Sequence, residues 1–167
     1  MKIVKKHIIT IAGRPGSGKS TTSKAIAKEL GYEHFSSGDL FRAIGKERGF
    51  DVHDTNLLAE KEKEIDELVD QRLRDIGATQ DNVAIDSRMA WHWIPQSFKV
   101  FLDLDLNVAA QRILANMTPE RIENEHIPTE LQEYANRLAS RLASETKRYK
   151  RLYNVDPYDS ANYDLVV

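Results

Sequence analysis

The sequence predicts a single α/β domain in which a parallel β-sheet is covered by helices on both faces. Short apolar segments alternate with longer segments of helical periodicity along the 167 residues, and this alternation is typical of parallel sheets. One apolar segment, residues 7–12, leads directly into a glycine-rich turn that is followed by a helix. A chain of this length is large enough for one domain with its own core.

Five segments have the composition of β-strands. They are short and rich in β-branched or aromatic residues, and residues 100–104 are apolar enough for a strand buried on both faces. The predicted strands are residues 7–12, 32–36, 83–86, 100–104 and 163–167.

Helices are predicted between these strands, over residues 20–30, 39–48, 56–76, 107–116 and 129–153. The pair Thr118-Pro119 predicts one further helix start, because proline is favoured in the first helical turn. Gly49 and Gly77 predict helix ends, since glycine readily adopts the left-handed conformation that closes a helix.

Residues 13–20 fit G-x-x-x-x-G-K-[ST], the P-loop pattern, between a predicted strand and a predicted helix. Glycines let backbone N–H groups turn toward phosphate oxygens, and the helix start adds partial positive charge. The alternative is a glycine-rich turn that binds nothing. We expect a nucleoside triphosphate to contact Gly13, Arg14, Pro15, Gly16, Ser17, Gly18, Lys19, Ser20 and Thr21.

Two side chains of this loop have specific expected roles. Lys19 supplies a full positive charge toward the outer phosphates, and the Ser20 hydroxyl is placed to ligate Mg²⁺.

Composition excludes several other classes of protein. The formal net charge of −2 gives no bulk attraction to nucleic acid or membranes, and no apolar run approaches the roughly 20 residues that span a bilayer. The chain has no cysteine, which excludes disulfides and thiolate chemistry, and its five histidines show no metal-binding spacing. The basic N-terminus continues into the first strand rather than a signal peptide. We therefore expect a cytoplasmic, ATP-using protein.

The second predicted strand ends in Ser36-Ser37-Gly38-Asp39-Leu40-Phe41-Arg42, at the sheet edge that carries the P-loop. The planar guanidinium of Arg42 is suited to grip a phosphate through two oxygens, with Ser37 and Gly38 presenting hydrogen bonds beside it. The alternative makes Asp39 a helix cap and Arg42 a solvated residue.

The third predicted strand ends in Asp86-Ser87-Arg88. Asp86 is placed to hold Mg²⁺, directly or through water, and Arg88 to form a second phosphate clamp; the alternative is a surface ion pair. Arg141, Glu145 and Arg148 in the last predicted helix share one helical face. That spacing alone also fits ion pairs on a solvated helix.

These segments together resemble the nucleoside monophosphate kinases, most closely the archaeal-type cytidylate kinases. The G-D-L-F-R and D-S-R elements, the R-x-x-x-E-x-x-R face, and the later R-Y-x-x-L-Y-x-V-D and Y-D-L-V segments carry the resemblance nearly end to end. It implies the sheet order 2-3-1-4-5 and arginines that reach the substrate phosphates. Ser87 replaces the glycine of the family pattern, which puts the local backbone shape in question, and the family usually continues beyond residue 167.

Two segments are longer than a minimal strand–helix–strand crossover requires, and we expect them to form a monophosphate-binding insertion of about 48–82 and a lid of about 117–128. The core would then consist of residues 1–47, 83–116 and 129–167. Asp66, Asp70 and Arg72 have the chemistry to read the acceptor base, or are solvated helix charges. Trp91 and Trp93 are more simply explained by packing than by stacking on a base.

One arginine that leads into the lid, Arg112, matches a family residue over the adenine or the phosphates of ATP. A second arginine common in the family is replaced by Asn116, with Arg121 as a substitute.

The sequence thus predicts a monomeric kinase that transfers the γ-phosphoryl group of ATP, with Mg²⁺, to CMP or dCMP. Two alternatives stay open: another acceptor, such as AMP, UMP or a phosphate-free small molecule, and a nucleotide-binding module without catalysis. The G-D-L-F-R element argues against a phosphate-free acceptor. The C-terminal Arg-Glu-Arg face favours CMP over AMP, and the N-K-x-D element of a switch GTPase is absent.

Overall fold

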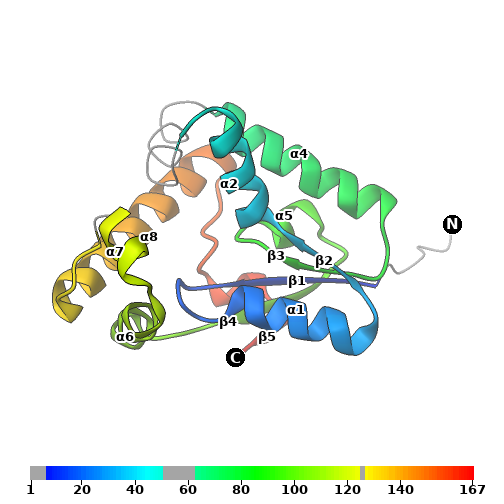
Figure 1. Ribbon diagram of the computed structural model, residues 1–167. Coiled ribbons are helices and arrows are strands. Elements are labelled where there is room, and N and C mark those ends of the chain that lie inside the picture. The colour runs from blue at the N-terminus through cyan, green and yellow to red at the C-terminus, as the bar shows by residue number, and fades with distance from the viewer. Residues whose placement is uncertain (1–6, 51–62, 125–126) are drawn as a thin grey trace, which may run out of the picture.

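The computed structural model describes residues 7–50, 63–124 and 127–167 (Figure 1). A five-stranded sheet forms its centre, and all neighbouring strands pair in parallel. The strand order β2-β3-β1-β4-β5 confirms the order that the resemblance implied. The strands are β1 (Ile8–Gly13), β2 (Glu33–Ser36), β3 (Val83–Asp86), β4 (Phe98–Leu102) and β5 (Leu165–Val166).

Helices connect the strands and cover the sheet on both faces (Figure 1). They are α1 (Lys19–Leu30), α2 (Ser37–Glu47), α4 (Glu64–Thr79), α5 (Ala90–Trp93), α6 (Leu106–Asn116), α7 (Pro119–Asn124) and α8 (Leu131–Tyr153), with a short 3₁₀ turn at Ser160–Asn162.

Side-chain alternation along β1 divides the core into two layers. Ile11 points to one face, in the same cluster as Ile26 of α1. Ile8 points to the other face and packs against Leu73 and Ile76 of α4. The described part of α4 therefore closes the core over β1 and β3, as well as connecting β2 to β3. On the same face, Tyr149 anchors α8 against the sheet.

Several predicted boundaries were wrong by a few residues. The strand predicted at 100–104 begins at Phe98 and ends at Leu102, and the strand predicted at 163–167 is limited to Leu165–Val166. The short helix α5 was not predicted. Of the helix predicted at 56–76, residues 56–62 lie outside the described residues, and the rest continues to Thr79.

Gly77 does not end a helix, contrary to the sequence prediction. It is buried inside α4, and a Cβ atom at this position would lie 3.0 Å from Cγ1 of Ile94. The glycine is needed for close approach of α4 to the segment that follows α5, a tertiary constraint that local sequence does not reveal. Gly49, by contrast, has a φ of 79° just beyond α2, as predicted for a helix end.

We expect Gly77→Leu to lower the free energy of unfolding by about 1–3 kcal/mol, because the added side chain overpacks the contact with Ile94. Ala78→Leu, one residue further along and on the exposed side of the helix, is the matched control. Urea denaturation of both variants measures the difference. Equal stability of the two variants would contradict this account of Gly77.

Candidate active site

The P-loop joins β1 to α1 at the carboxyl edge of the sheet. Gly16 and Gly18 adopt left-handed conformations, with φ values of 69° and 87°, and Gly18 is the N-cap of α1. A Cβ atom at Gly16 would lie 3.0 Å from the side chain of Ile113 on α6, so the loop passes directly beneath that helix. These glycines shape a cradle that a side chain would fill, and the first N–H groups of α1 open into it.

Ser17 gives a second indication of a ligand at this loop. Its hydroxyl oxygen is buried, and among the described residues it has no hydrogen-bond partner. Buried hydroxyl groups without partners are costly, so such a group in a phosphate-binding loop is suited to a ligand oxygen.

Lys19 is held by the loop itself. Its ammonium donates to the backbone oxygens of Gly13 and Arg14, at 3.2 and 3.1 Å. Burial and the nearby charge of Arg88 lower its pKa to about 8, although Asp86 and Glu145 act in the opposite direction. Anionic phosphate groups would favour the charged form of this lysine.

Asp86 ends β3 and is 7% exposed. The Ser36 hydroxyl donates to one carboxylate oxygen at 3.0 Å, and Nε2 of His34 lies 3.0 Å from the other. Ser36 and Asp86 are partners in the parallel β2–β3 ladder, so the register itself creates the first contact. The contact with His34 was not predicted, because no histidine was assigned a role in the site.

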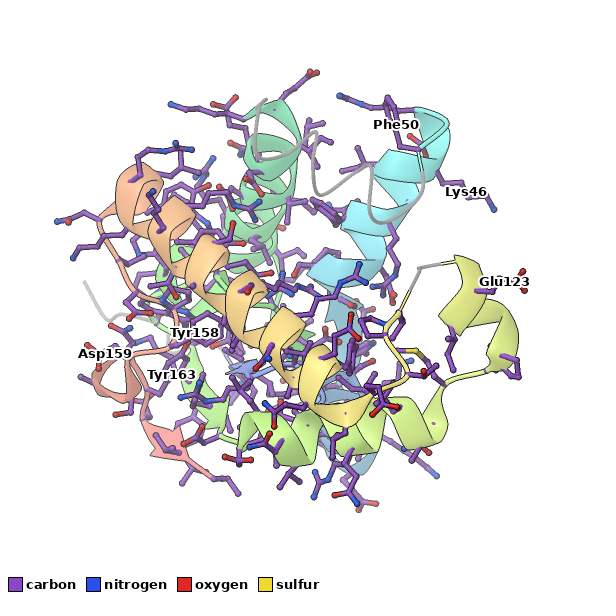
Figure 2. The ribbon with its side chains drawn as sticks, turned by 90° about the vertical axis from the view of Figure 1, so that its left-hand side faces the viewer. Lys46, Phe50, Glu123, Tyr158, Asp159 and Tyr163 are labelled. Atoms are coloured by element: carbon purple, nitrogen blue, oxygen red, sulfur yellow. The ribbon has the colours of Figure 1, made fainter. Side chains whose placement is uncertain are left out.

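Glu145 on α8 joins two of the predicted arginines. The residue is 6% exposed, and its carboxylate lies 3.2 Å from Nε of Arg88 and 3.0 Å from Nε of Arg141. The Tyr158 hydroxyl, on the segment after α8 (Figure 2), donates to the same carboxylate at 2.6 Å. Burial alone would raise the pKa of Glu145, but Arg88, Arg141 and Tyr158 together lower it to about 2.

A pocket opens between α2, α4 and α8, beside the segment that follows β3. Arg42 at this pocket pairs with Asp39 one helical turn earlier, and its side chain is half exposed. The pocket is lined by Ser37, Gly38, Phe41, Arg42, Asp66, Val69, Asp70, Leu73, Ser87, Arg88, Met89, Arg141, Arg148 and Tyr149.

Two acidic side chains of α4 reach this pocket. Asp66 lies beside Arg148, with 3.7 Å between Oδ2 and Nε. Asp70 accepts hydrogen bonds from the Trp93 indole at 2.8 Å and from the Tyr153 hydroxyl. Burial raises the pKa of both aspartates, although Arg148 opposes the rise for Asp66 and the two hydrogen bonds oppose it for Asp70.

Most of the predicted acceptor residues line this one pocket, but a few lie elsewhere. Arg72 is exposed and does not line it, and Asp39 reaches it only through Arg42. Trp91 is buried, and its indole donates to the backbone oxygen of Arg88, which confirms the packing interpretation. Arg112 is exposed on α6, next to the residue that contacts the P-loop.

Sequence reasoning missed the apolar wall of the pocket, which consists of Phe41, Val69, Leu73, Met89 and Tyr149. Of these five residues, only Val69 and Leu73 of α4 could have been found from a pattern in the sequence. Asp66, Val69, Asp70 and Leu73 are spaced i, i+3, i+4 and i+7, so they share one helical face.

Within the described ranges, no three His, Asp or Glu side chains gather into a group that would hold a metal ion by themselves. Ser20 is exposed at the start of α1, and Asp86 lies at the neighbouring strand end. In the same ranges no helix has the length and apolar character needed to cross a membrane.

Residues 12–127 match the AAA domain family, and curated proteins match nearly the whole chain. The cytidylate kinase of Natronomonas pharaonis is 37% identical over 96% of this chain and 79% of its own length. That of Haloquadratum walsbyi is 39% identical with the same coverage. Among solved structures, a shikimate kinase from Bacteroides thetaiotaomicron aligns with a TM-score of 0.62 at 17% identity, over 96% of this chain and 85% of its own, which shows the shared fold.

The ion pairs of Glu145 lead to a prediction about acid stability. Because its pKa falls from 4.5 to about 2 on folding, the carboxylate contributes stability above pH 4.5 and loses it as pH drops toward 2. This contribution is on the order of 3 kcal/mol. Glu145→Gln removes it and leaves Arg88 and Arg141 without their buried anionic partner.

We therefore expect Glu145→Gln to be less stable than wild type at pH 7, with a difference that shrinks between pH 5 and pH 2. Urea unfolding across this range measures both curves. Parallel curves for the two proteins would contradict the assignment.

Proposed function

The chain belongs to the cytidylate kinase family, and we propose that it transfers the γ-phosphoryl group of ATP to the phosphate of CMP or dCMP. One observation carries the proposal: a pocket with arginines and an apolar wall adjoins a P-loop that retains its lysine. The arginines suit the acceptor's phosphate, and the apolar wall suits its base. ATP suits the P-loop beside it.

The reaction needs positioning and charge more than a strong base. An oxygen of the acceptor phosphate attacks the γ-phosphorus, and the bond from that phosphorus to the bridging β,γ-oxygen breaks, giving ADP and CDP or dCDP. The acceptor oxygen is already anionic, so no group must first remove a proton. Catalysis then rests on alignment of two polyanions and on neutralisation of their repulsion by Lys19, Arg42, Arg88, Arg141 and Arg148.

Ser20 and Asp86 are the residues we assign to Mg²⁺, with Asp86 acting directly or through a water. The orphan hydroxyl of Ser17 and the glycine cradle fit the triphosphate of this metal–nucleotide complex. When bound, Mg²⁺ supplies positive charge that stabilises the phosphate oxygens during transfer.

Closure around the substrates would exclude water and limit wasteful hydrolysis of ATP. We assign this role to the lid of about 117–128 and the insertion of about 48–82, of which residues 51–62, 125 and 126 lie outside the described residues. The helix α2 with Lys46, which leads into the insertion, and α7 with Glu123, which belongs to the lid, lie on the same flank of α8 (Figure 2). Arg112, on the helix that leads into the lid, would contact ATP.

A coupled assay of ADP release tests the function directly. We expect turnover with CMP and dCMP, and much less with UMP, with AMP or without an acceptor. Lys19→Ala should lower kcat by about 10³-fold or more, because it removes the charge beside the transferred group. Preference for another acceptor, or ADP release independent of any acceptor, would overturn the proposal.

The placement of Arg42 at the acceptor gives a second test. Arg42→Ala should raise KM for CMP roughly 10- to 100-fold, since a bidentate charged contact is lost. The dissociation constant of ATP should change less than about twofold, as expected for a residue outside the ATP site. Lys46→Ala removes a positive charge from the same helix outside the pocket lining and should match wild type. Equal losses for ATP and CMP would refute this placement.

A further inference from the structure

We propose that Asp66, and not Asp70, reads the acceptor base by accepting a hydrogen bond from the 4-amino group of a cytosine ring. This inference rests on the proposed function, because it assumes that the pocket beside the P-loop holds a nucleoside monophosphate. The two aspartates lie one helical turn apart on the same face of α4 and both line the pocket. Their hydrogen bonding distinguishes them.

Both carboxylate oxygens of Asp70 already accept hydrogen bonds from other parts of the protein. The Trp93 indole N–H donates to Oδ1 at 2.8 Å, and the Tyr153 hydroxyl donates to Oδ2. These two donors come from α5 and α8, so the carboxylate links three helices. A ligand that used either oxygen would compete with a contact that the folded protein makes without it.

Asp66, by contrast, is buried with one carboxylate oxygen that, in the part of the chain the structure describes, is free to accept a hydrogen bond. The residue is 8% exposed, and among the described residues its Oδ2 has no hydrogen-bond partner. The nearest cation is Arg148, whose Nε is also buried without a partner, at a distance of 3.7 Å that is too long for a hydrogen bond. An acceptor and a donor thus stand side by side in the pocket, and both are unsatisfied. A buried donor and acceptor without hydrogen-bond partners cost free energy, and a ligand that bonds to both groups would offset that cost.

The surroundings of this pair define the kind of ligand. Val69, Leu73 and Met89 supply apolar surface, and Phe41 and Tyr149 supply aromatic surface, in the same pocket. A flat, largely apolar group with polar atoms at its edge fits such a wall. A pyrimidine ring has this form, and cytosine carries both an amino donor and carbonyl and ring-nitrogen acceptors at its edge.

The position of the pair along the pocket agrees with this role. Arg88 follows β3 at the sheet edge that carries the P-loop and pairs there with Glu145. Asp66 lies in the first turn of α4. A nucleotide with its phosphate at Arg88 would therefore direct its base toward α4 and Asp66.

The chemistry also distinguishes cytosine from uracil. A carboxyl oxygen of Asp66 accepts from the 4-amino group of cytosine, whereas uracil presents its O4 acceptor at the same place. Two acceptors facing each other repel, and the loss of a hydrogen bond to a charged group in a buried site lowers affinity by about 10- to 100-fold.

The test is a thermodynamic cycle between ligand and protein. Binding of CMP and of its analogue without the 4-amino group, pyrimidin-2-one ribonucleoside 5′-monophosphate, is measured by calorimetry. Wild type should bind the analogue about 10- to 100-fold more weakly. Asp66→Ala should bind the two ligands equally, and Asp66→Asn should gain relative affinity for UMP because its amide N–H donates to O4.

Two controls isolate the position. Glu67→Gln, an exposed charge change on the same helix, should keep the wild-type ratio of CMP to analogue affinity. Asp70→Asn should keep that ratio too, while lowering thermal stability, because one amide oxygen cannot accept the hydrogen bonds of both Trp93 and Tyr153 in the places of two carboxylate oxygens.

The outcomes separate the two levels of the proposal. If wild type binds no CMP, the proposed function fails. If it binds CMP and the analogue equally, or if Asp66→Ala keeps the wild-type ratio, Asp66 is not the reader. The wild-type comparison and Asp70→Asn also decide the matter if the Asp66 variants do not fold, because a ratio lost in Asp70→Asn assigns the reading to Asp70.

Discussion

The buried carboxylate of Glu145 is the constraint on which the rest of the site depends. Two arginines with different origins, Arg88 after β3 and Arg141 on α8, are held within 3.2 and 3.0 Å of it. Without an anion between them, two guanidinium groups this near to one another would repel and separate. The carboxylate thus keeps positive charge concentrated at the carboxyl edge of the sheet before any phosphate arrives. The Tyr158 hydroxyl donates to the oxygen of this carboxylate that also faces Arg88.

Concentrated charge of this kind suits a reaction between two anions. The P-loop occupies the end of β1, Asp86 ends β3, and the parallel register brings these ends to one edge. The helical layer then adds what the sheet edge lacks: arginines from α2 and α8, and an apolar wall partly from α4. Lys19 bonds to its own loop, so its ammonium has polar partners until a phosphate competes for it.

The sequence predicted the parts of the site that depend on local pattern. The P-loop follows β1, Arg42 lies in the helix that follows β2, and Arg88 follows β3, so the sheet topology brings them to one edge. The sequence did not predict contacts between segments far apart along the chain. Tyr158 meets Glu145, and His34 meets Asp86, only because the tertiary fold aligns them. Gly77 was wrongly predicted as a helix end for the same reason, since the residue that requires a glycine there belongs to another segment.

The central claim is that two nucleotides meet with their phosphates facing one another over this edge, between the lysine of the P-loop and the arginine cluster. A crystal structure with adenosine and cytidine joined through a pentaphosphate tests it most directly. We predict that the bridging phosphates contact Lys19, Arg42 and Arg88, with the cytosine ring against the apolar wall near α4. A bound molecule whose phosphorus atoms all lie away from Arg42 or from Arg88 would contradict the account.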